Sequence, residues 1–287
     1  MTAVRFVTCS TLPSITADDQ FTAAALRKHG IEATAQPWDS ALAFPCPAIL
    51  RSTWNYHLKP AEFLSWIGNL EATGTPIWNH PDTIRWNLDK FYLQELEERG
   101  FPIIPTVFLP RGAPANLSSI LTARNWPAAV LKPSISATSR LTCTVTQALA
   151  ARQQPLLDNL LTAHSVLVQK FMPEIQTTGE LSLVFFNGVY SHAMRKNAAQ
   201  GDFRVQEEYG GRTSGIAADE STIEQASRVL SLTPGAPHLY ARVDGIVSAA
   251  IFFIMEIELI EPCLYLATNP QSPARFAEAI ASRLNHA

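Results

Sequence analysis

The sequence has few cysteines and no long apolar run, and both absences restrict what the protein can be. Its four cysteines, Cys9, Cys46, Cys143 and Cys263, lie far apart and include no C-x-x-C pair, so we expect reduced, mostly packed thiols. No apolar run approaches the roughly 20 residues of a membrane span, and no membrane partner is expected. The chain opens on a strand-like segment without a signal-peptide pattern, which predicts a cytoplasmic protein.

Charged residues are also scarce. They make up 16% of the 287 residues and give a formal net charge of −3, so the chain as a whole has no basic field and no nucleic-acid partner is expected. Hydrophobic residues make up 47%, which is ordinary for a globular protein. A chain of this length suffices for two modest domains or three small lobes, and a homodimer is compatible with the sequence.

The pattern of elements changes twice along the chain. Residues 1–85 alternate strand-like and helix-like stretches, which predicts a small, Rossmann-like parallel α/β domain. Residues 86–165 begin with a predicted helix over Leu88–Arg99 and include a strand at Ala129–Lys132. Residues 166–287 are rich in strands, and Asn187-Gly188 predicts a tight hairpin. The predicted fold class is therefore α/β, with an N-terminal domain followed by two further lobes.

The most unusual stretch is Val247–Leu266, an apolar strand that carries carboxylates. Side chains alternate along a strand, so Glu256 and Glu258 lie on one face. No Lys or Arg occurs within the stretch, and two unpaired carboxylates on such a strand are costly unless a cation or ordered water meets them. A reversal near Ser248 would bring Asp244 beside them and complete an oxygen ligand set for Mg²⁺. The alternative is a half-exposed strand with an acidic polar face.

Other polar segments offer contacts for an anion. The loop Arg51–Tyr56 follows a predicted parallel strand, where such sheets place ligands, and suits a small anionic or zwitterionic substrate. The alternative is a surface charge at Arg51 and core rings at Trp54 and Tyr56. Lys90 falls in the first turn of the predicted helix, where main-chain N–H groups favour an anion. The loop Ser134–Arg140 is rich in hydroxyl groups and could fold over phosphates, although it lacks glycine.

An ordered set of short motifs runs from about Asn79 to Leu266. Its members are Asn79-His80-Pro81 followed by Asn87-Leu88-Asp89-Lys90, then Val130-Leu131-Lys132-Pro133, then Gly201-Asp202-Phe203-Arg204 with Gly210-Gly211, and last Arg242-Val243-Asp244 with Glu256-Ile257-Glu258. In this order they resemble the motifs of the ATP-grasp ligases, on the side that includes bacterial glutathione synthetase and the ribosomal-protein glutamate ligases. The Arg-Ser-Thr-Trp loop and the Glu-Leu-Ile-Glu-Pro ending are similar to a branch that includes the cyclo-ligase forming D-cycloserine.

The resemblance implies a fold and an activity. The fold is a pre-ATP-grasp domain over residues 1–85, followed by ATP-grasp lobes over 86–165 and 166–287. The activity is ATP-dependent carboxylate–amine ligation through an acyl phosphate on a small amino acid or derivative, with release of ADP and phosphate, and with intramolecular ring closure as a variant. ATP and Mg²⁺ are the implied cofactors. The alternatives are a non-catalytic nucleotide-binding protein and a Mg²⁺-dependent small-molecule kinase.

The resemblance also implies a role for individual residues. The implied ATP contacts are Lys90, Lys132, Gln169, Lys170, Phe171, Met172, Glu180 with Glu174 as its rival, and Arg204 at the γ-phosphate. The implied catalytic residues are Lys132, Arg204 and Arg242, and the implied Mg²⁺ ligands are Asp244, Glu256 and Glu258. The implied substrate contacts are Arg51, Ser52, Thr53 and Trp54. Two departures from the family pattern are the glycine-free Ser134–Arg140 loop and Glu258, where relatives often carry Asn.

Overall fold

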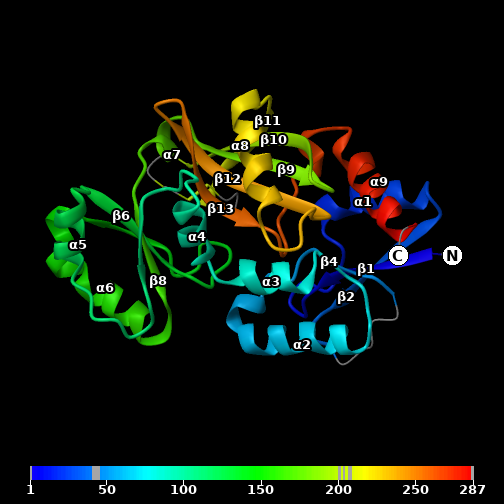
Figure 1. The fold of residues 1–287 in the computed structure, drawn as a ribbon, viewed down its shortest axis with the longest axis horizontal. Coiled ribbons are helices and arrows are strands. Elements are labelled where there is room, and N and C mark those ends of the chain that lie inside the picture. The colour runs from blue at the N-terminus through cyan, green and yellow to red at the C-terminus, as the bar shows by residue number, and fades with distance from the viewer. Residues whose placement is uncertain (1, 41–45, 200–201, 203, 206–208, 286–287) are drawn as a thin grey trace.

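The computed structural model describes residues 2–40, 46–199, 202, 204–205 and 209–285, and three sheets organise them (Figure 1). The first sheet is wholly parallel, in the order β2-β1-β3-β4. Its strands and the helices between them are β1 (Thr2–Thr8), α1 (Ala17–Arg27), β2 (Ile31–Pro37), β3 (Ala48–Leu50), α2 (Pro60–Ala72) and β4 (Ile77–Trp78). The predicted N-terminal parallel α/β unit is therefore confirmed.

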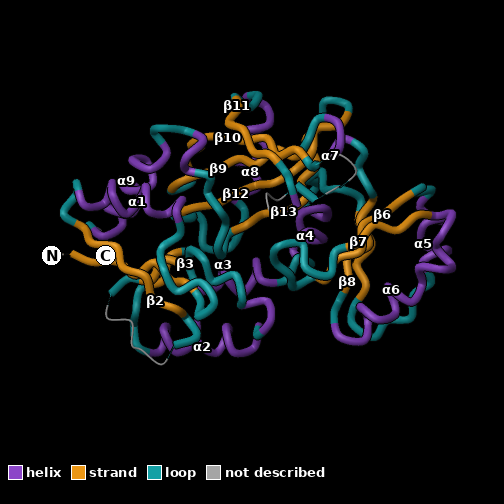
Figure 2. The backbone as a smooth tube through the Cα atoms, turned by 180° about the vertical axis from the view of Figure 1, so that it is seen from behind, coloured by secondary structure: helices purple, strands orange, loops and turns teal. Residues whose placement is uncertain are grey.

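The second sheet forms a lobe that stands apart at one end of the molecule (Figures 1 and 2). It is antiparallel, in the order β5-β8-β6-β7. Its elements are β5 (Thr106–Leu109), α5 (Leu117–Arg124), β6 (Ala128–Pro133), β7 (Cys143–Thr146), α6 (Ala150–Ala163) and β8 (Val166–Lys170). Leu121 and Leu157 of the two helices pack on Ala129 and Leu131 of β6. The next side chains in β6, Val130 and Lys132, line a cavity on the other face.

The third sheet is antiparallel and has the order β11-β10-β9-β12-β13. Its strands and the helices near them are α4 (Tyr92–Glu98), α7 (Glu174–Thr177), β9 (Glu180–Phe186), β10 (Val189–Asn197), β11 (Arg212–Ile216), α8 (Glu220–Ser231), β12 (Tyr240–Ser248), β13 (Ile251–Glu258) and α9 (Ser272–Leu284). The hairpin prediction is confirmed, because Asn187 and Gly188 join β9 to β10 with φ of 47° and 77°.

The sequence-based domain limits differ from the sheets in one place. The limit at residues 165 and 166 assigns β8 to the last segment, whereas β8 pairs with β5 and β6 in the second sheet. The pairing joins segments distant in sequence, which the apolar run Val166–Val168 alone does not reveal. The second sheet therefore extends to Lys170.

The predicted single helix Leu88–Arg99 is wrong. The structure has α3 (Pro81–Leu88) and α4, separated by a bend in which Asp89 is extended, with φ −106° and ψ 117°. Lys90 thus lies in the bend and not in the first turn of a helix. The bend is held because the Lys90 main-chain N–H donates to the Ser134 carbonyl at 3.0 Å.

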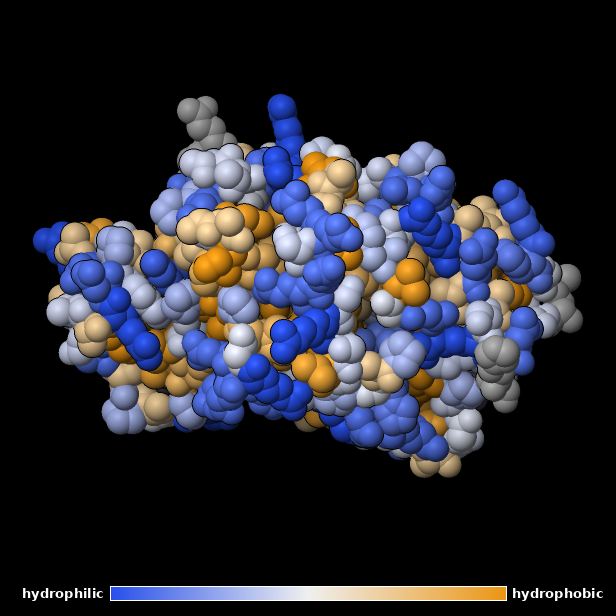
Figure 3. Space-filling view, turned by 45° about the horizontal axis from the view of Figure 1, so that its top comes forward, coloured by the Kyte–Doolittle hydropathy of each residue, from blue (hydrophilic) through white to orange (hydrophobic). Residues whose placement is uncertain are grey.

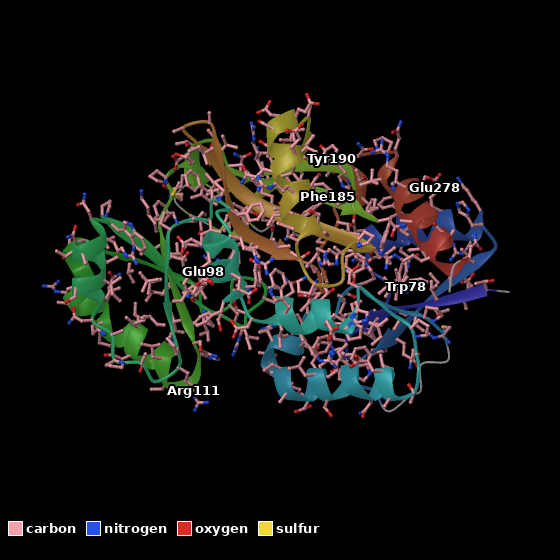
Figure 4. All side chains as sticks on the ribbon, in the orientation of Figure 1. Trp78, Glu98, Arg111, Phe185, Tyr190 and Glu278 are labelled. Atoms are coloured by element: carbon pink, nitrogen blue, oxygen red, sulfur yellow. The ribbon has the colours of Figure 1, made fainter. Side chains whose placement is uncertain are left out.

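Polar contacts join the first and third sheets. The Tyr240 hydroxyl donates to the carbonyls of Leu50 at 2.7 Å and Ile260 at 2.8 Å. The Asn79 amide, in the first motif of the ordered set, donates to the carbonyls of Tyr240 and Leu259, both at 2.8 Å, and so connects the two domains. Trp78 lies at this junction (Figure 4). These contacts fix the N-terminal domain against the third sheet.

The surface of the molecule is mostly hydrophilic on the face that Figure 3 shows, as expected for a globular protein. Hydrophilic residues cover much of the face in Figure 3, and apolar residues lie in small groups between them. In the described part of the chain, no helix combines the length and the apolar character that crossing a membrane requires. The two ends of the chain lie near each other, beside α1 and α9 (Figure 1).

Candidate active site

A cavity of about 450 Å³ lies where the three parts of the molecule meet. Trp54 and Tyr56 of the N-terminal domain form one wall, Val130 and Lys132 of the second sheet form another, and β12 and β13 form a third. The volume falls within the usual range for small-molecule sites. All three parts of the molecule therefore position side chains around one partly open cavity.

The segment that the resemblance assigns to adenine lines one end of this cavity. Gln169, Lys170, Phe171 and Met172 all contribute to the wall. The N–H of Lys170 donates to the Pro105 carbonyl at 2.8 Å, and that of Phe171 donates to the Ala128 carbonyl at 3.1 Å. Within the described ranges, no main-chain acceptor meets the N–H of Met172.

The surroundings of this segment are apolar. Ile104, Ile175, Val205 and Ile246 cluster with Met172, and all of them line the cavity. An apolar slot beside a main-chain N–H suits a flat heterocycle that carries a hydrogen-bond acceptor. The residues present thus fit an adenine ring.

The two rival carboxylates for the ribose lie in different places. Glu180 is buried at the start of β9, lines the cavity and accepts from the Lys196 ammonium at 2.7 Å. Glu174 does not line the cavity and accepts a hydrogen bond from the Ser248 hydroxyl. The geometry favours Glu180 as the ribose contact and does not support Glu174.

Two buried lysines face the middle of the cavity. Burial lowers the pKa of Lys132 to about 8, although the Glu256 carboxylate opposes this shift. Lys90 extends from the bend before α4, and its ammonium lies 3.1 Å from Glu256 and donates to the Ser136 carbonyl at 2.6 Å. Two cations converging on one space fit a polyanion such as a triphosphate.

The glycine-free loop closes over the same part of the cavity. Ser136, Ala137, Thr138 and Ser139 line it. Thr138, Ser139 and Leu141 have φ of 53°, 54° and 58°, a left-handed conformation that glycine usually supplies. The missing glycines therefore do not prevent the loop from turning over the cavity.

The reversal predicted near Ser248 is confirmed, and it places the acidic residues side by side. In the β12–β13 pair, Asp244 lies opposite Glu256 and Arg242 lies opposite Glu258. All four side chains line the cavity. The face of the sheet at this point is therefore both acidic and cationic.

Asp244 is saturated by hydrogen bonds. Its carboxylate accepts from the Arg242 guanidinium at 2.8 to 3.1 Å and from the Ser182 hydroxyl at 2.6 Å, and Lys196 lies 3.5 Å away. Burial raises the pKa of Asp244, but Arg242 and Lys196 outweigh burial and hold this pKa below its usual value. Asp244 thus orients Arg242 in the structure as it stands.

Cations do meet these carboxylates, as the sequence analysis required, and in this structure they are side chains of the protein. Glu256 pairs with Lys90, and Glu258 pairs with Arg242. The cations come from elements outside Val247–Leu266, so the stretch alone could not reveal them. Among the described residues, no group of three or more His, Cys, Asp or Glu side chains is gathered in a way that could hold a metal ion.

The donor set nevertheless suits a hard cation once nucleotide is present. The side chains of Glu256 and Glu258 are 28% and 26% exposed. Burial raises the pKa of Glu258 to about 7, with Arg242 opposing and Asp244 reinforcing the shift. Carboxylate oxygens, together with phosphate oxygens of a nucleotide, are the ligands Mg²⁺ prefers.

Lys196 is a site residue that the sequence analysis did not single out. It is buried, lines the cavity and bridges Glu180 at 2.7 Å and Asp244 at 3.5 Å. Alternation along β10 places Lys196 with the buried Met194, so the strand period could have indicated an inward-facing cation.

Arg204 reaches the cavity from the loop between β10 and β11. Its guanidinium donates to Asp202 at 2.7 and 3.1 Å, and it lies 3.7 Å from the centre of the Tyr209 ring. Gly201 and Phe203 of the predicted motif lie outside the described residues. Arg204 is thus placed where an anion in the cavity could meet it.

The substrate loop is only partly as predicted. Trp54 lines the cavity, but Arg51, Ser52 and Thr53 do not, and all three are buried. Arg51 donates to Asp19 at 2.8 Å and to the Pro262 carbonyl at 2.9 Å. Nε and Nη2 of Arg51 thus bond within the protein, whereas its Nη1 is buried with no hydrogen-bond partner among the described residues, and the substrate role of Arg51 stays a prediction.

The comparisons with known proteins agree with this architecture. Residues 4–79 match the family model described as D-cycloserine synthetase DcsG, N-terminal domain. The cycloserine biosynthesis protein DcsG of Streptomyces lavendulae is 32% identical in an alignment of 281 positions that covers 91% of this chain and 91% of that protein. The crystal structure of D-cycloserine synthetase DcsG superposes with a TM-score of 0.87 at 28% identity, over 98% of this chain and 99% of that one.

A more distant structure shares the fold. The D-alanine–D-alanine ligase of Bacillus anthracis, crystallised with ATP, has a TM-score of 0.72 at 16% identity, over 100% of this chain and 99% of that one. The parallel N-terminal sheet and the two antiparallel lobes are thus the ATP-grasp fold. The chain belongs to the D-cycloserine synthetase DcsG family of ATP-grasp ligases.

Proposed function

We propose that this ATP-grasp ligase activates the carboxylate of a small amino-acid derivative with ATP and closes a ring by attack of a nitrogen in the same molecule. One observation carries the proposal. A single cavity of about 450 Å³ is lined by Gln169–Met172, here called the hinge segment, by Lys90 and Lys132, and by Arg242 with Asp244, Glu256 and Glu258. A nucleotide and a small acceptor would therefore share this cavity. The similarity to a cycloserine biosynthesis protein is the reason to prefer ring closure to the joining of two molecules.

The chemistry requires activation because a carboxylate is a poor electrophile. In the proposed reaction, a carboxylate oxygen bonds to the γ-phosphorus of ATP and the bond to ADP breaks. The substrate nitrogen then bonds to the acyl carbon, phosphate leaves with the electrons of the carbon–oxygen bond, and the nitrogen gives up a proton. The products are ADP, phosphate and a cyclic amide. Such phosphoryl transfer depends on positioning and charge neutralisation more than on covalent catalysis.

The residues of the cavity suit these tasks. Lys90, Lys132 and Arg204 would stabilise the phosphate charges. The guanidinium of Arg242 is held by Asp244 at 2.8 Å and by Glu258, and in this position it would stabilise the acyl group. Asp244, Glu256 and Glu258 are the proposed Mg²⁺ ligands, with Arg242 and the lysines giving up part of their present contacts. Bound Mg²⁺ would neutralise phosphate charge.

A turnover assay tests the proposal. Hydrolysis of the ring amide of D-cycloserine gives an open-chain aminooxy acid, which is the test substrate. We expect equimolar ADP, phosphate and cyclised product with Mg²⁺-ATP, and an acyl hydroxamate when hydroxylamine is added. Glu256→Gln should fold normally and lose turnover.

Other outcomes would contradict the proposal. A stable phosphorylated product without a carbon–nitrogen bond would indicate a kinase. ATP binding without turnover on any acid would indicate a binding protein. Turnover that requires a separate amine would indicate a ligase that joins two molecules.

A further inference from the structure

A carboxyl group that none of the proposed ATP or Mg²⁺ contacts uses lines the same cavity. Glu261 lies in the segment that follows β13, and only 8% of it is exposed. The neighbouring cations are taken by other acids, since Lys90 pairs with Glu256 and Arg242 pairs with Glu258. In the described ranges, no Lys, Arg or His lies within ion-pair distance of Glu261.

Two aromatic residues of the N-terminal domain lie beside Glu261. The Tyr56 hydroxyl lowers the pKa of the Glu261 carboxyl group, against the larger effect of burial. The Trp54 indole N–H donates to the Glu261 main-chain carbonyl at 3.1 Å. Both rings line the cavity, and they belong to the N-terminal domain, whereas the hinge segment belongs to the second sheet. The carboxyl group thus lies where the N-terminal domain meets the cavity.

A buried carboxylate without a cation is unfavourable. Burial is the main reason that the pKa of Glu261 is raised to about 8, with Glu258 adding to the shift and Lys90 opposing it. A ligand that brings its own positive charge would supply the ion-pair partner that the described chain does not. The surroundings therefore suit a cationic group on the ligand.

We infer that Glu261, with Tyr56 and Trp54, binds the protonated amino group of the amino-acid-derived substrate. This inference rests on the proposed function, because it concerns the substrate of the same cavity. An ammonium group offers three donors, which suit a carboxylate and a phenol oxygen, and it is attracted to the face of an indole ring. A protonated amino group has no lone pair, so the same contact would keep it from competing with the ring-closing nitrogen.

Calorimetric titration of D-cycloserine, which keeps a free amino group, tests this contact. Glu261→Gln preserves the side-chain shape and the main-chain bond to Trp54 but removes the negative charge. We expect the Kd for D-cycloserine to rise at least about tenfold, because a charge-assisted hydrogen bond is lost. Tyr56→Phe should raise the Kd by a smaller factor. Glu174→Gln, which neutralises a carboxyl group outside the cavity, is the matched control and should leave the Kd unchanged.

A second pair of probes separates this inference from the proposed function. D-alaninamide carries a protonated amino group, and N-acetyl-D-alaninamide does not. If D-cycloserine does not bind the wild type, ring closure is contradicted. In that case, binding of the two amides, measured by saturation-transfer NMR, still tests the role of Glu261. We expect the wild type to prefer D-alaninamide and Glu261→Gln to lose that preference.

Two results would overturn the inference. One is equal binding of both amides by the wild type. The other is a Glu261→Gln variant that keeps the preference for the amino group while its Tm falls, because that outcome assigns Glu261 a structural role. If Glu261→Gln does not fold, the test uses Tyr56→Phe. A weaker preference of this variant for D-alaninamide would support the inference, and an unchanged preference would overturn it.

Discussion

At the scale of single residues, we predict that Lys132 makes nucleotide binding sensitive to pH. Its pKa is lowered to about 8 by burial, so the ammonium loses its proton as pH rises through 8, while the phosphate groups of ATP keep their charge. A triphosphate pairs with the protonated form only. We therefore expect the Kd for Mg²⁺-ATP to rise by up to about tenfold between pH 8 and 9, measured by calorimetry.

The matched variant for this prediction is Lys132→Arg. A guanidinium stays charged across this range, so the variant should bind ATP with a nearly flat pH profile. A profile that rises equally in both proteins would show that another group is responsible. A flat profile in the wild type would mean that Lys132 does not contact phosphate.

The residues of the site differ in how well sequence predicts them. Glu256 and Glu258 stand out because acids interrupt an apolar strand, and strand alternation alone places them on one face. The partners of these acids are less predictable, since Lys90 and Lys196 come from distant elements. Arg51 was assigned to the substrate because it ends a parallel strand, but the position of Asp19 decides where its guanidinium points.

At the scale of elements, the β12–β13 turn departs from its preferred residues. Ala249 and Ala250 are exposed and have φ of 48° and 63°, and Ser248 pairs with Ile251 across the turn. Two-residue turns with positive φ at both positions favour Asn-Gly. Replacing Ala249 by Asn and Ala250 by Gly should raise the free energy of unfolding by about 1 kcal/mol, a rise in Tm of about 2–4 °C.

The β9–β10 turn supplies the control for this change. It already carries Asn187-Gly188 in the same conformation, and Gly188→Ala should lower the Tm while it leaves the hydrogen bonds of the Asn187 side chain to Ala279 and Arg283 intact. Turnover should be unaffected by the Ala249 and Ala250 changes, because neither residue lines the cavity. A lower Tm after the Asn-Gly replacement would contradict the turn geometry.

Elements whose pattern is local were predicted well. The hairpin at Asn187 and the parallel N-terminal sheet follow from turn chemistry and from alternation of strands and helices. The break between α3 and α4 was missed, because it depends on the contact of Lys90 with Ser134 across the molecule. The place of β8 was also missed, since an apolar run does not specify which strands it pairs with.

At the scale of the whole molecule, main-chain carbonyls of one domain are bound by side chains of another. The Tyr240 hydroxyl donates to Leu50, the Asn79 amide donates to Leu259, and the Asn87 amide donates to Ile257 at 2.7 Å. Loss of one such donor leaves a buried carbonyl unpaired. The wall that carries Trp54 and Tyr56 is therefore held firmly beside the acidic strands, which an active site built from separate domains requires.

Arg51 belongs to the same set of contacts, and its substitution tests the architecture. It joins Asp19 in α1 to Pro262 after β13, and its guanidinium lies 5.0 Å from the centre of the Tyr240 ring. Lysine cannot make both hydrogen bonds, so Arg51→Lys should lower the free energy of unfolding by about 2 kcal/mol, or the Tm by about 4–8 °C. Asp19→Asn should have a similar effect, because it breaks the same ion pair. The KM values for ATP and for the amino-acid substrate should stay unchanged in both variants. If Arg51→Lys instead raised the substrate KM tenfold and left the Tm unaltered, Arg51 would be a substrate ligand and the cavity would extend beyond Trp54.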